Sequence, residues 1–373
     1  MTEILVLSSG VQTTVQDLGR FGYQSLGVPP SGAMDRDALE TANLLVGNPR
    51  GEACLECVLG GLELECGAPL VFAVCGVPMD PRVNGKPAPG YETLRAKAGD
   101  VISLGMAERG LCAYIAFAGG LAVDPVLKSR STYARAGFGG WRGRPLRAGD
   151  RIPLREGAAG PSAAPGLRDA SPLIRFVPEE LRPRYSAEIT LRAIRSHEAA
   201  RFQPESLSRF FSEPFFVSPK SDRMGCRLEG PSLAHSRGAD ILSAGVQTGT
   251  VQVPGDGFPI ILRVDRQTTG GYARIAHVIQ TDFAKLGQLR PGDSVRFLET
   301  TVEAAQEAWK KREAAIVKSI REKTDLPRPM PRAESGIASR AAPGAQVSQE
   351  EMRHFNVIVN GIAYDVTLRE IRV

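Results

Sequence analysis

The chain has 373 residues, enough for two or three domains, and its 42% hydrophobic and 23% charged residues are typical of a globular protein, which excludes wholesale disorder. Its 40 glycines and 27 prolines predict many turns and therefore a β-rich fold. The net charge of +5 is spread along the chain without a run of five like charges, which argues against nucleic-acid binding.

No stretch approaches the roughly 18 consecutive apolar residues that a membrane span needs. The first residues also lack the cationic start and apolar run of a secretory signal. We therefore expect a cytoplasmic protein with no membrane partner. The six cysteines are typical of small buried hydrophobic residues in a reducing compartment. Cys54 and Cys57 form a lone CxxC, for which we expect a structural role, because no second pair or nearby histidine completes a zinc site.

The segment 12–35 is the first with many hydrogen-bonding side chains. Its glycines and consecutive prolines predict an irregular, tightly folded loop. Two interpretations stay open: a plain polar loop in which Asp17 and Arg20 pair locally, or a loop that lines a site. We expect Ser31 to cap a helix over 35–47, with Asp35 in its first turn. The donors and acceptors of the segment are Gln12, Thr13, Thr14, Gln16, Asp17, Arg20, Ser31 and Asp35.

Short apolar runs bounded by turn residues predict strands at 70–74, 111–117, 259–264 and 294–298. The segments 94–104, 146–154 and 289–298 share a leucine and a basic residue, then Gly-Asp, then an alternating strand. This repetition predicts similar turns near 99, 149 and 292, and two lobes built on one plan. The small residues and prolines of 156–172 indicate the boundary between a first lobe, 1–155, and a second lobe, 173–299.

After residue 299 the pattern changes. Thr300 and Glu303 form a capping box at the start of a predicted helix over 300–323, whose apolar face we expect to pack on the second lobe. The Pro-rich segment 324–350 is typical of a flexible linker. In 351–373, two alternating runs flank Asn360-Gly361, a strong hairpin signal. A lone hairpin is marginally stable, so this tail needs further packing.

Common catalytic motifs are missing from the sequence. It contains no phosphate-binding loop, no nucleotide-binding GxGxxG, no GxSxG elbow and no HExxH. The segment 84–87, Asn-Gly-Lys-Pro, predicts a hairpin turn. The four histidines are widely separated, so we expect no metal site.

Two further polar clusters lie at 221–231 and 264–279, the second preceded by 251–262. Each contains an Asp-Arg pair, Asp222-Arg223 and Asp265-Arg266. These pairs are either structural ion pairs at strand ends or parts of a polar pocket. In the second case the backbone amides of Gly270 and Gly271 could approach a substrate oxygen closely. The other pocket candidates are Gln252, Gln267, Thr268, Thr269 and Tyr272.

Together with 12–35, 128–150 and 288–297, these clusters resemble the KipA-like family, also called allophanate hydrolase subunit 2, the biotin-dependent carboxyltransferase family or the 5-oxoprolinase C-subunit family. The resemblance runs from about residue 4 to 299. It implies a mainly β fold of two lobes with cyclophilin-like β-barrel architecture. It also implies a hetero-oligomer in which a KipI-like partner completes the site, as in the carboxyltransferase part of urea carboxylase.

The tail looks like the first strands of a biotin carboxyl carrier domain. None of the nine lysines lies between methionines, as the biotin attachment motif requires, so the resemblance implies a biotin carrier on another chain. Carboxyl transfer to a urea-like or amide nitrogen would then also involve a biotin carboxylase, with ATP used at a partner subunit.

The resemblance assigns roles to the clusters. Arg223, Arg266 and the Gly270-Gly271 amides would polarise oxygen, while Asp222 and Asp265 would hold the arginines or accept the N–H of the acceptor. The substrate-binding residues would be Gln12, Asp17, Arg20, Ser31, Asp35, Gln252, Gln267, Thr268, Thr269, Gly270, Gly271 and Tyr272.

Two alternatives stay open. The first is the C-subunit of an ATP-dependent 5-oxoprolinase, which opens 5-oxoproline to glutamate with KipI-like and LamB-type subunits. The second is a regulatory protein that binds a KipI-like kinase inhibitor. The carrier-like tail favours a carboxylase origin over the regulatory alternative.

Overall fold

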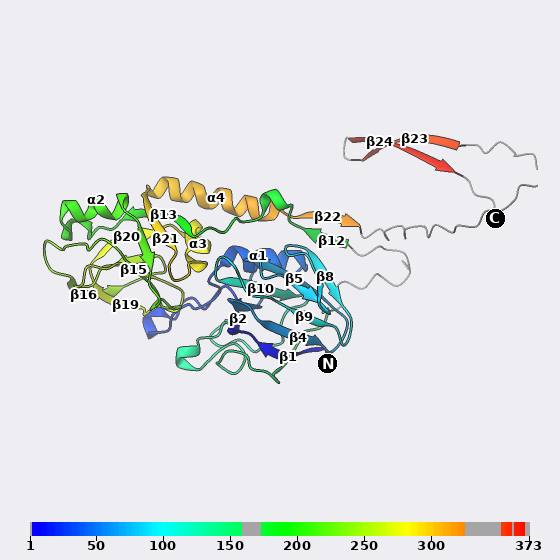
Figure 1. Cartoon of the computed structure of the whole chain (residues 1–373), viewed down its shortest axis with the longest axis horizontal. Helices are drawn as coiled ribbons and strands as arrows, with labels where there is room; N and C mark the ends of the chain where they lie inside the picture. Colours follow the sequence, from blue (N-terminus) through cyan, green and yellow to red (C-terminus); the bar gives the residue numbers. More distant parts are fainter. Residues whose placement is uncertain (1, 159–172, 325–351, 360–361, 370–373) are drawn as a thin grey trace, which may run out of the picture. The chain divides into compact units, whose positions relative to one another are not determined.

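Antiparallel strands dominate the chain in the computed structural model (Figure 1). The structure describes residues 2–158, 173–324, 352–359 and 362–369. The chain divides into two compact units, Met1–Leu326 and Pro327–Val373. The first unit contains two lobes. Most of the boundary segment 156–172 and the linker 324–350 lie outside the described residues.

Two open sheets face each other in the first lobe. The six-stranded sheet has the order β11-β1-β4-β9-β6-β7, and the five-stranded sheet has the order β2-β3-β10-β5-β8. The strands of the first sheet are β1 (Glu3–Ser9), β4 (Leu62–Cys66), β6 (Arg82–Val83), β7 (Lys86–Pro87), β9 (Val101–Ser103) and β11 (Arg151–Pro153). Those of the second are β2 (Gln12–Gln16), β3 (Cys54–Val58), β5 (Leu70–Gly76), β8 (Thr93–Ala96) and β10 (Cys112–Phe117).

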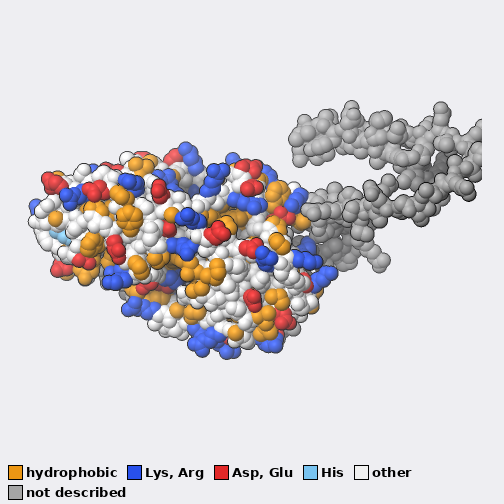
Figure 2. Space-filling view, viewed as in Figure 1, with side chains coloured by type: hydrophobic (Ala, Val, Ile, Leu, Met, Phe, Trp, Pro, Cys, Tyr) orange, Lys and Arg blue, Asp and Glu red, His pale blue; other side chains and the backbone are white. Residues whose placement is uncertain are grey.

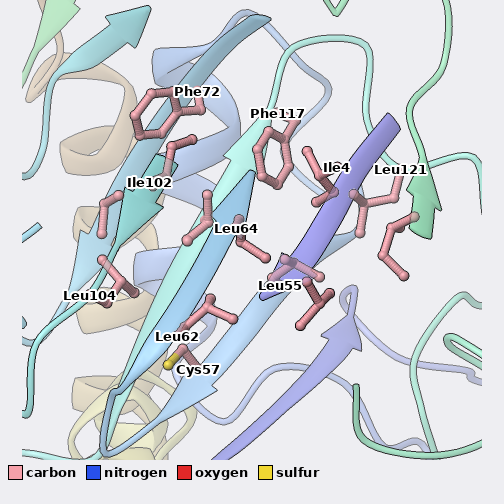
Figure 3. Packing of buried hydrophobic residues seen from close by; sticks show 14 of the residues in the cluster. Ile4, Leu55, Cys57, Leu62, Leu64, Phe72, Ile102, Leu104, Phe117 and Leu121 are labelled. Carbon is pink, nitrogen blue, oxygen red and sulfur yellow. The ribbon is translucent and has the colours of Figure 1, made fainter. Parts of the chain in front are cut away.

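The core of this lobe lies between the two sheets. Figure 3 shows Ile4 and Leu64 from one sheet packed with Phe72 and Phe117 from the other. Helix α1 (Arg36–Leu45) covers the opposite face of the five-stranded sheet through residues such as Leu39. Strand β5 is therefore buried along its whole length, which explains its continuous apolar run. Two short 3-10 turns complete the lobe, η1 (Gln24–Leu26) and η2 (Ala134–Ala136).

The second lobe is a closed barrel with the strand order β13-β20-β17-β18-β15-β14-β21. Its strands are β13 (Glu188–Arg195), β14 (Phe215–Val217), β15 (Gly225–Glu229), β17 (Thr250–Gln252), β18 (Ile260–Leu262), β20 (Arg274–Val278) and β21 (Ser294–Glu299). Phe210, Phe215 and Phe297 pack together inside it, with 4.2 Å between the ring centroids of Phe210 and Phe297. The mainly β expectation with a barrel is confirmed, and the closed barrel belongs to the second lobe.

Shorter elements surround the barrel. They are a ribbon of β16 (Asp240–Gly245) with β19 (Thr269–Tyr272), helices α2 (Pro204–Ser212) and α3 (Phe283–Gly287), and the 3-10 turns η4 (Ala199–Arg201) and η5 (Gln280–Asp282). The 3-10 turn η3 (Glu179–Leu181) lies beside Tyr91 of the first lobe. No helix in the described part of the chain is long and apolar enough to cross a membrane. On the face that Figure 2 shows, basic and acidic side chains are interspersed.

The Gly-Asp turns repeat in three dimensions. The carboxylates of Asp100, Asp150 and Asp293 each accept a hydrogen bond from the backbone N–H three residues earlier, at 2.7, 2.8 and 2.8 Å. The preceding glycines Gly99, Gly149 and Gly292 have φ values of 82°, 88° and 89°. Each turn then pairs with a neighbouring strand, β4, β1 or β14, through two backbone bonds. The prediction of similar strand-entry turns in both lobes is confirmed.

The helix predicted over 300–323 is shorter than expected. Helix α4 spans Val302–Lys318, and Thr301 rather than Thr300 caps it by accepting from the N–H of Ala304 at 3.2 Å. The chain then forms strand β22 (Arg321–Thr324), which pairs with β12 (Leu173–Phe176). Pairing with a distant strand therefore overrides local helix propensity there. Helix α4 contacts η5 of the second lobe and also α1 of the first lobe.

The second unit contains a hairpin of β23 (Met352–Val359) and β24 (Ile362–Arg369). The strands are antiparallel, and Val359 pairs with Ile362, so two residues connect them. The predicted hairpin is confirmed, while its turn at 360–361 lies outside the described residues.

Substituting Gly292 with alanine should lower the free energy of unfolding by about 1 kcal/mol, because its φ of 89° is in the left-handed region that a Cβ disfavours. The matched control is Gly245→Ala in β16, where a Cβ also meets open space but φ is not positive. Urea unfolding of both variants measures the difference. A loss as large for Gly245→Ala as for Gly292→Ala would contradict the conformational cause.

Candidate functional site

A cavity of about 720 Å³ lies between the two lobes. Its walls come from the loop between β2 and α1, from the barrel around β18 and β20, from η5 and α3, and from α4. The polar and charged side chains that line it are Gln24, Ser31, Arg36, Asp37, Gln247, Thr248, Arg263, Arg266, His277, Gln280, Gln306 and Lys310. A cavity of this size fits a small organic ligand.

Asp17 holds the cavity loop in place. Its carboxylate accepts hydrogen bonds from Ser129 Oγ at 2.7 Å, from the N–H of Arg130 at 2.6 Å and from the N–H of Gly19 at 2.8 Å. Gly19 and Gly32 then pack backbone against backbone, and a Cβ on Gly32 would come within 2.9 Å of the Gly19 nitrogen. Since its oxygens are already bonded within the chain, Asp17 is a loop organiser rather than a ligand group.

Ser31 faces the cavity instead of capping a helix. Its φ is 54°, its N–H donates to the carbonyl of Val264 at 3.0 Å, and its buried Oγ has no partner among the described residues. The cap of α1 is Asp35, whose side chain accepts from the N–H of Ala38 at 3.0 Å. The predicted Ser31 cap is therefore wrong, because Asp35 directly precedes the first helical residue and has the extended backbone of an N-cap.

Arg223 is fully engaged in joining the lobes. Its Nε donates to Asp265 at 2.8 Å, its Nη1 to Glu56 of β3, and its Nη2 to the carbonyl of Gly32 at 2.7 Å. The carboxylates of Asp265 and Glu56 raise the pKa of this guanidinium. Arg223 therefore forms structural ion pairs. This agrees with the first of the two interpretations of the cluster that contains Asp222 and Arg223.

Arg266 is different, because it is buried with free donors. It is 2% exposed and lines the cavity, and its Nη2 donates to the carbonyl of Val246 at 3.3 Å. Its Nε and Nη1 have no partner among the described residues. Burial lowers the pKa of Arg266 to about 10, so it stays protonated at neutral pH. These N–H groups are available to a ligand oxygen.

Arg20 and Asp265 also have buried polar atoms without hydrogen-bond partners among the described residues. Arg20 is 1% exposed, stacks its guanidinium 4.9 Å from the ring centroid of Phe138, and leaves Nε and Nη1 without partners among the described residues. Burial lowers its pKa, while Asp17 and Asp265 act in the opposite direction. Asp265 likewise keeps Oδ1 buried without a partner in the described part of the chain.

Asp35 lies beside a second cavity of about 410 Å³ that shares Asp37 and Ala284 with the first. Gln288 donates to its Oδ2 at 2.7 Å, and its own N–H donates to Tyr114 Oη at 2.8 Å. Burial raises the pKa of Asp35 to about 7, with a smaller contribution from Asp37. The carboxyl is therefore close to half protonated near neutral pH.

The remaining predicted residues lie apart from the main cavity. The ribbon residues Gln267 to Tyr272 do not line it in the part of the chain that the structure describes. Gln252 packs over Gly270, donates to the carbonyl of Tyr272 at 3.2 Å and accepts from Gln267 at 3.3 Å. Asp222 closes its own turn by accepting from the N–H of Met224 at 2.8 Å, and Gln12 is a half-buried residue of β2.

Several residues of the site escape sequence reasoning. Glu56 stands in the apolar strand run Cys54–Val58, and a charge in such a run is a signal that it has a buried partner. Gln288 and Arg263 offer no such local signal. The helical pattern predicts Trp309 on a packing face, whereas it lines the cavity together with its neighbour Lys310.

Comparisons with known proteins agree with this architecture. Residues 26–299 match the family model of the carboxyltransferase domain, subdomain A and B. The chain belongs to this carboxyltransferase family. The resemblance drawn from the sequence is therefore confirmed at family level.

Three members illustrate the family. The chain is 36% identical over 303 residues to the 5-oxoprolinase C-subunit of Escherichia coli strain K12, covering 81% of this chain and 93% of that protein. It is 33% identical to urea amidolyase of Lachancea kluyveri, covering 83% of this chain but 18% of that protein. The crystal structure of Kluyveromyces lactis urea carboxylase matches with a TM-score of 0.78 and 29% identity, over 91% of this chain and 32% of that one. These relatives are parts of larger enzymes, which supports a place for this family member in an enzyme complex.

Replacing Arg223 with methionine should lower the free energy of unfolding by roughly 3–5 kcal/mol, because it leaves the carboxylates of Glu56 and Asp265 buried without their cation. Arg266→Met is the matched control, since Arg266 has no carboxylate partner among the described residues. Its cost in urea unfolding should be under about 1 kcal/mol. Equal losses in the two variants would contradict the distinction between the two arginines.

The raised pKa of Asp35 predicts a pH dependence of stability. The native state keeps a proton that the unfolded state releases between about pH 4 and pH 7, so stability falls as pH rises through this window. Asp35→Asn removes the titration. The unfolding free energy of the variant minus that of the wild type should rise across the window by up to about 1.4 kcal/mol per pH unit and level off above it. A flat difference in denaturant titrations would contradict the raised pKa.

Proposed function

We propose that this chain is the KipA-like subunit of a hetero-oligomeric enzyme that carboxylates the nitrogen of a small amide or urea-like acceptor, together with a KipI-like partner. The observation that carries the proposal is the pair of unused N–H groups on Arg266, buried beside the inter-lobe cavity. Such pre-positioned donors stabilise charge that develops on a carbonyl or ureido oxygen.

The residues of the cavity fit a role in positioning and polarisation. Arg266 donates to the oxygen of the reacting group, and Ser31 Oγ offers a further donor or acceptor on the same wall. Asp265 lies between the lining residues Val264 and Arg266, and its unused Oδ1 would accept the N–H of an acceptor that reaches it. Carboxylated biotin on its carrier would supply the carboxyl group, and the biotin nitrogen that loses this group would take up the proton that the acceptor nitrogen releases. The partner subunit would close the cavity and exclude water.

Arg223 does not share this role, because its donors are occupied by Asp265, Glu56 and Gly32. Asp222 does not share it either, because its carboxylate accepts hydrogen bonds from the N–H groups of Met224 and Gly225 in its own turn. Tyr272 of the ribbon is 43% exposed and remains a candidate for contact with the partner or its ligand. The residues next to it stay candidates with it: Gln252 of β17, Gln267, Thr268, Thr269, Gly270 and Gly271. The catalytic hypothesis therefore narrows to Arg266 and Asp265.

A second candidate is the C-subunit of an ATP-dependent 5-oxoprolinase. Two observations favour it. The match covers 93% of the Escherichia coli protein. The cavity also contains cations that have no carboxylate partner in the described chain, and such cations suit the carboxylate of 5-oxoproline. Both reactions activate an amide, but only the carboxylation requires biotin. In either case ATP is used by the complex at a partner subunit.

The experiment is co-purification of this chain with a KipI-like partner, followed by measurement of amide-dependent ATP hydrolysis with and without a biotinylated carrier and biotin carboxylase. The acceptors are urea, simple amides and 5-oxoproline. Turnover that requires the carrier supports carboxyl transfer, and carrier-independent turnover of 5-oxoproline, here with a LamB-type subunit added, supports the oxoprolinase. Tight binding without turnover of any acceptor would overturn both in favour of a regulatory role.

Arg266→Met should lower kcat/KM of the reconstituted complex by about 100-fold, the usual effect of removing a donor to a developing oxyanion. Arg227→Met is the control, because Arg227 is exposed on β15 and lies outside the cavity lining. Steady-state kinetics on the acceptor identified above measures both. Unchanged turnover in Arg266→Met would remove Arg266 from the mechanism.

A further inference from the structure

Helix α4 follows directly after residue 299, where the match to the family model ends. Even so, it forms one wall of the inter-lobe cavity, through Val302, Ala305, Gln306, Trp309 and Lys310. Their spacing of three and four residues places them on one helical face. The chain therefore adds a wall to the cavity from outside the range that matches the family model.

An ion-pair network fixes this wall to both lobes. Arg312 on α4 bonds to Asp37 and Glu40 of α1, and Arg50 joins Glu40 to Glu313 of α4, the latter at 2.9 Å. The Glu40 side chain is 1% exposed. At the other end, the N–H of Thr300 donates to the carbonyl of Ala193 in the barrel at 3.0 Å. The position of α4 over the cavity is thus set by partly buried bonds, which are stronger than exposed pairs.

The charges on the cavity wall do not balance. Arg36 is paired with Glu40, and Asp37 is paired with Arg312. Arg263, Arg266 and Lys310 have no carboxylate partner among the described residues. Trp309 adds a broad apolar surface beside them, with its ring 5.1 Å from the Arg312 guanidinium carbon. The cavity therefore offers a positive rim and floor next to an aromatic wall.

We propose that α4 determines ligand specificity, with Trp309 packing against the ligand and Lys310, together with Arg266, selecting an amide that carries a carboxylate. The inference rests on the proposed function insofar as the ligand is an amide. It goes further by assigning ligand selection to residues of α4, which follow the range matched by the family model. A neutral amide of the same shape meets Trp309 but leaves the cations without a partner, so it binds more weakly.

Binding is measured by fluorescence in the complex with the KipI-like partner. The chain has two tryptophans, Trp141 and Trp309, so in a Trp141→Phe background Trp309 is the sole tryptophan of this chain. A partner whose tryptophans are replaced by phenylalanine keeps the signal specific. The probes are 5-oxoproline and 2-pyrrolidone, the same lactam ring with and without a carboxylate. We expect 5-oxoproline to change the Trp309 emission and to bind more tightly.

Lys310→Met should weaken 5-oxoproline binding by about three- to fivefold, as for a partly exposed ion pair, and leave 2-pyrrolidone unchanged. Lys311→Met is the matched control, because Lys311 is 77% exposed, pairs with Glu307 and does not line the cavity. Equal affinities for the two lactams, equal effects of the two lysine variants, or a Trp309 emission that responds to neither probe would overturn the inference. Turnover of the complex is measured separately, so loss of the proposed function is distinguishable from loss of selectivity.

Discussion

A partly buried arginine between two buried carboxylates holds the two lobes in register. Arg223 comes from the second lobe and Glu56 from β3 of the first, and Glu56 also accepts from the N–H of Met34 at 2.9 Å and from Tyr114 Oη at 2.7 Å. Removing these charges from water is costly, and the interaction is favourable only where each donor meets an acceptor. Because these acceptors lie on both lobes, every nitrogen of Arg223 has an acceptor only when the lobes are in this relative position. This network therefore positions the two lobes that form the walls of the cavity.

The arginines of the junction differ in how many of their nitrogens have acceptors. In Arg223 every nitrogen has an acceptor, whereas Arg20 and Arg266 each leave two nitrogens without one in the described part of the chain. An unpaired buried donor costs roughly 1–3 kcal/mol, and more when it is charged. A fold tolerates this where a ligand supplies the missing acceptor. Burial alone therefore does not distinguish these arginines, whereas the number of their unpartnered N–H groups does.

Features that depend on neighbours along the chain were predictable from the sequence. The turns at Asp100, Asp150 and Asp293 are closed by a bond to the residue three positions earlier, and the hairpin at 352–369 needs two connecting residues. The family resemblance supplied the barrel. Contacts across the chain were not predictable in this way: Arg223 meets Glu56 across 167 positions, and β22 leaves the expected helix to pair with β12. The predicted Ser31 cap is wrong because the loop places Ser31 at the cavity, where its N–H donates to the carbonyl of Val264.

The cavity combines residues of the family-model range with residues on either side of that range. Its floor, with Arg263 and Arg266, lies inside the matched range 26–299. Leu18, Phe21 and Gln24 come from before that range, and the α4 residues come from after it, yet both flanks reach the same cavity. Arg263 and Arg266 follow β18, and the N–H groups of Arg263 and Asp265 pair with the carbonyls of Met224 and Arg223. The flanks are free of that pairing. We therefore expect substitutions on α4 to affect ligand binding more than they affect the positions of Arg263 and Arg266.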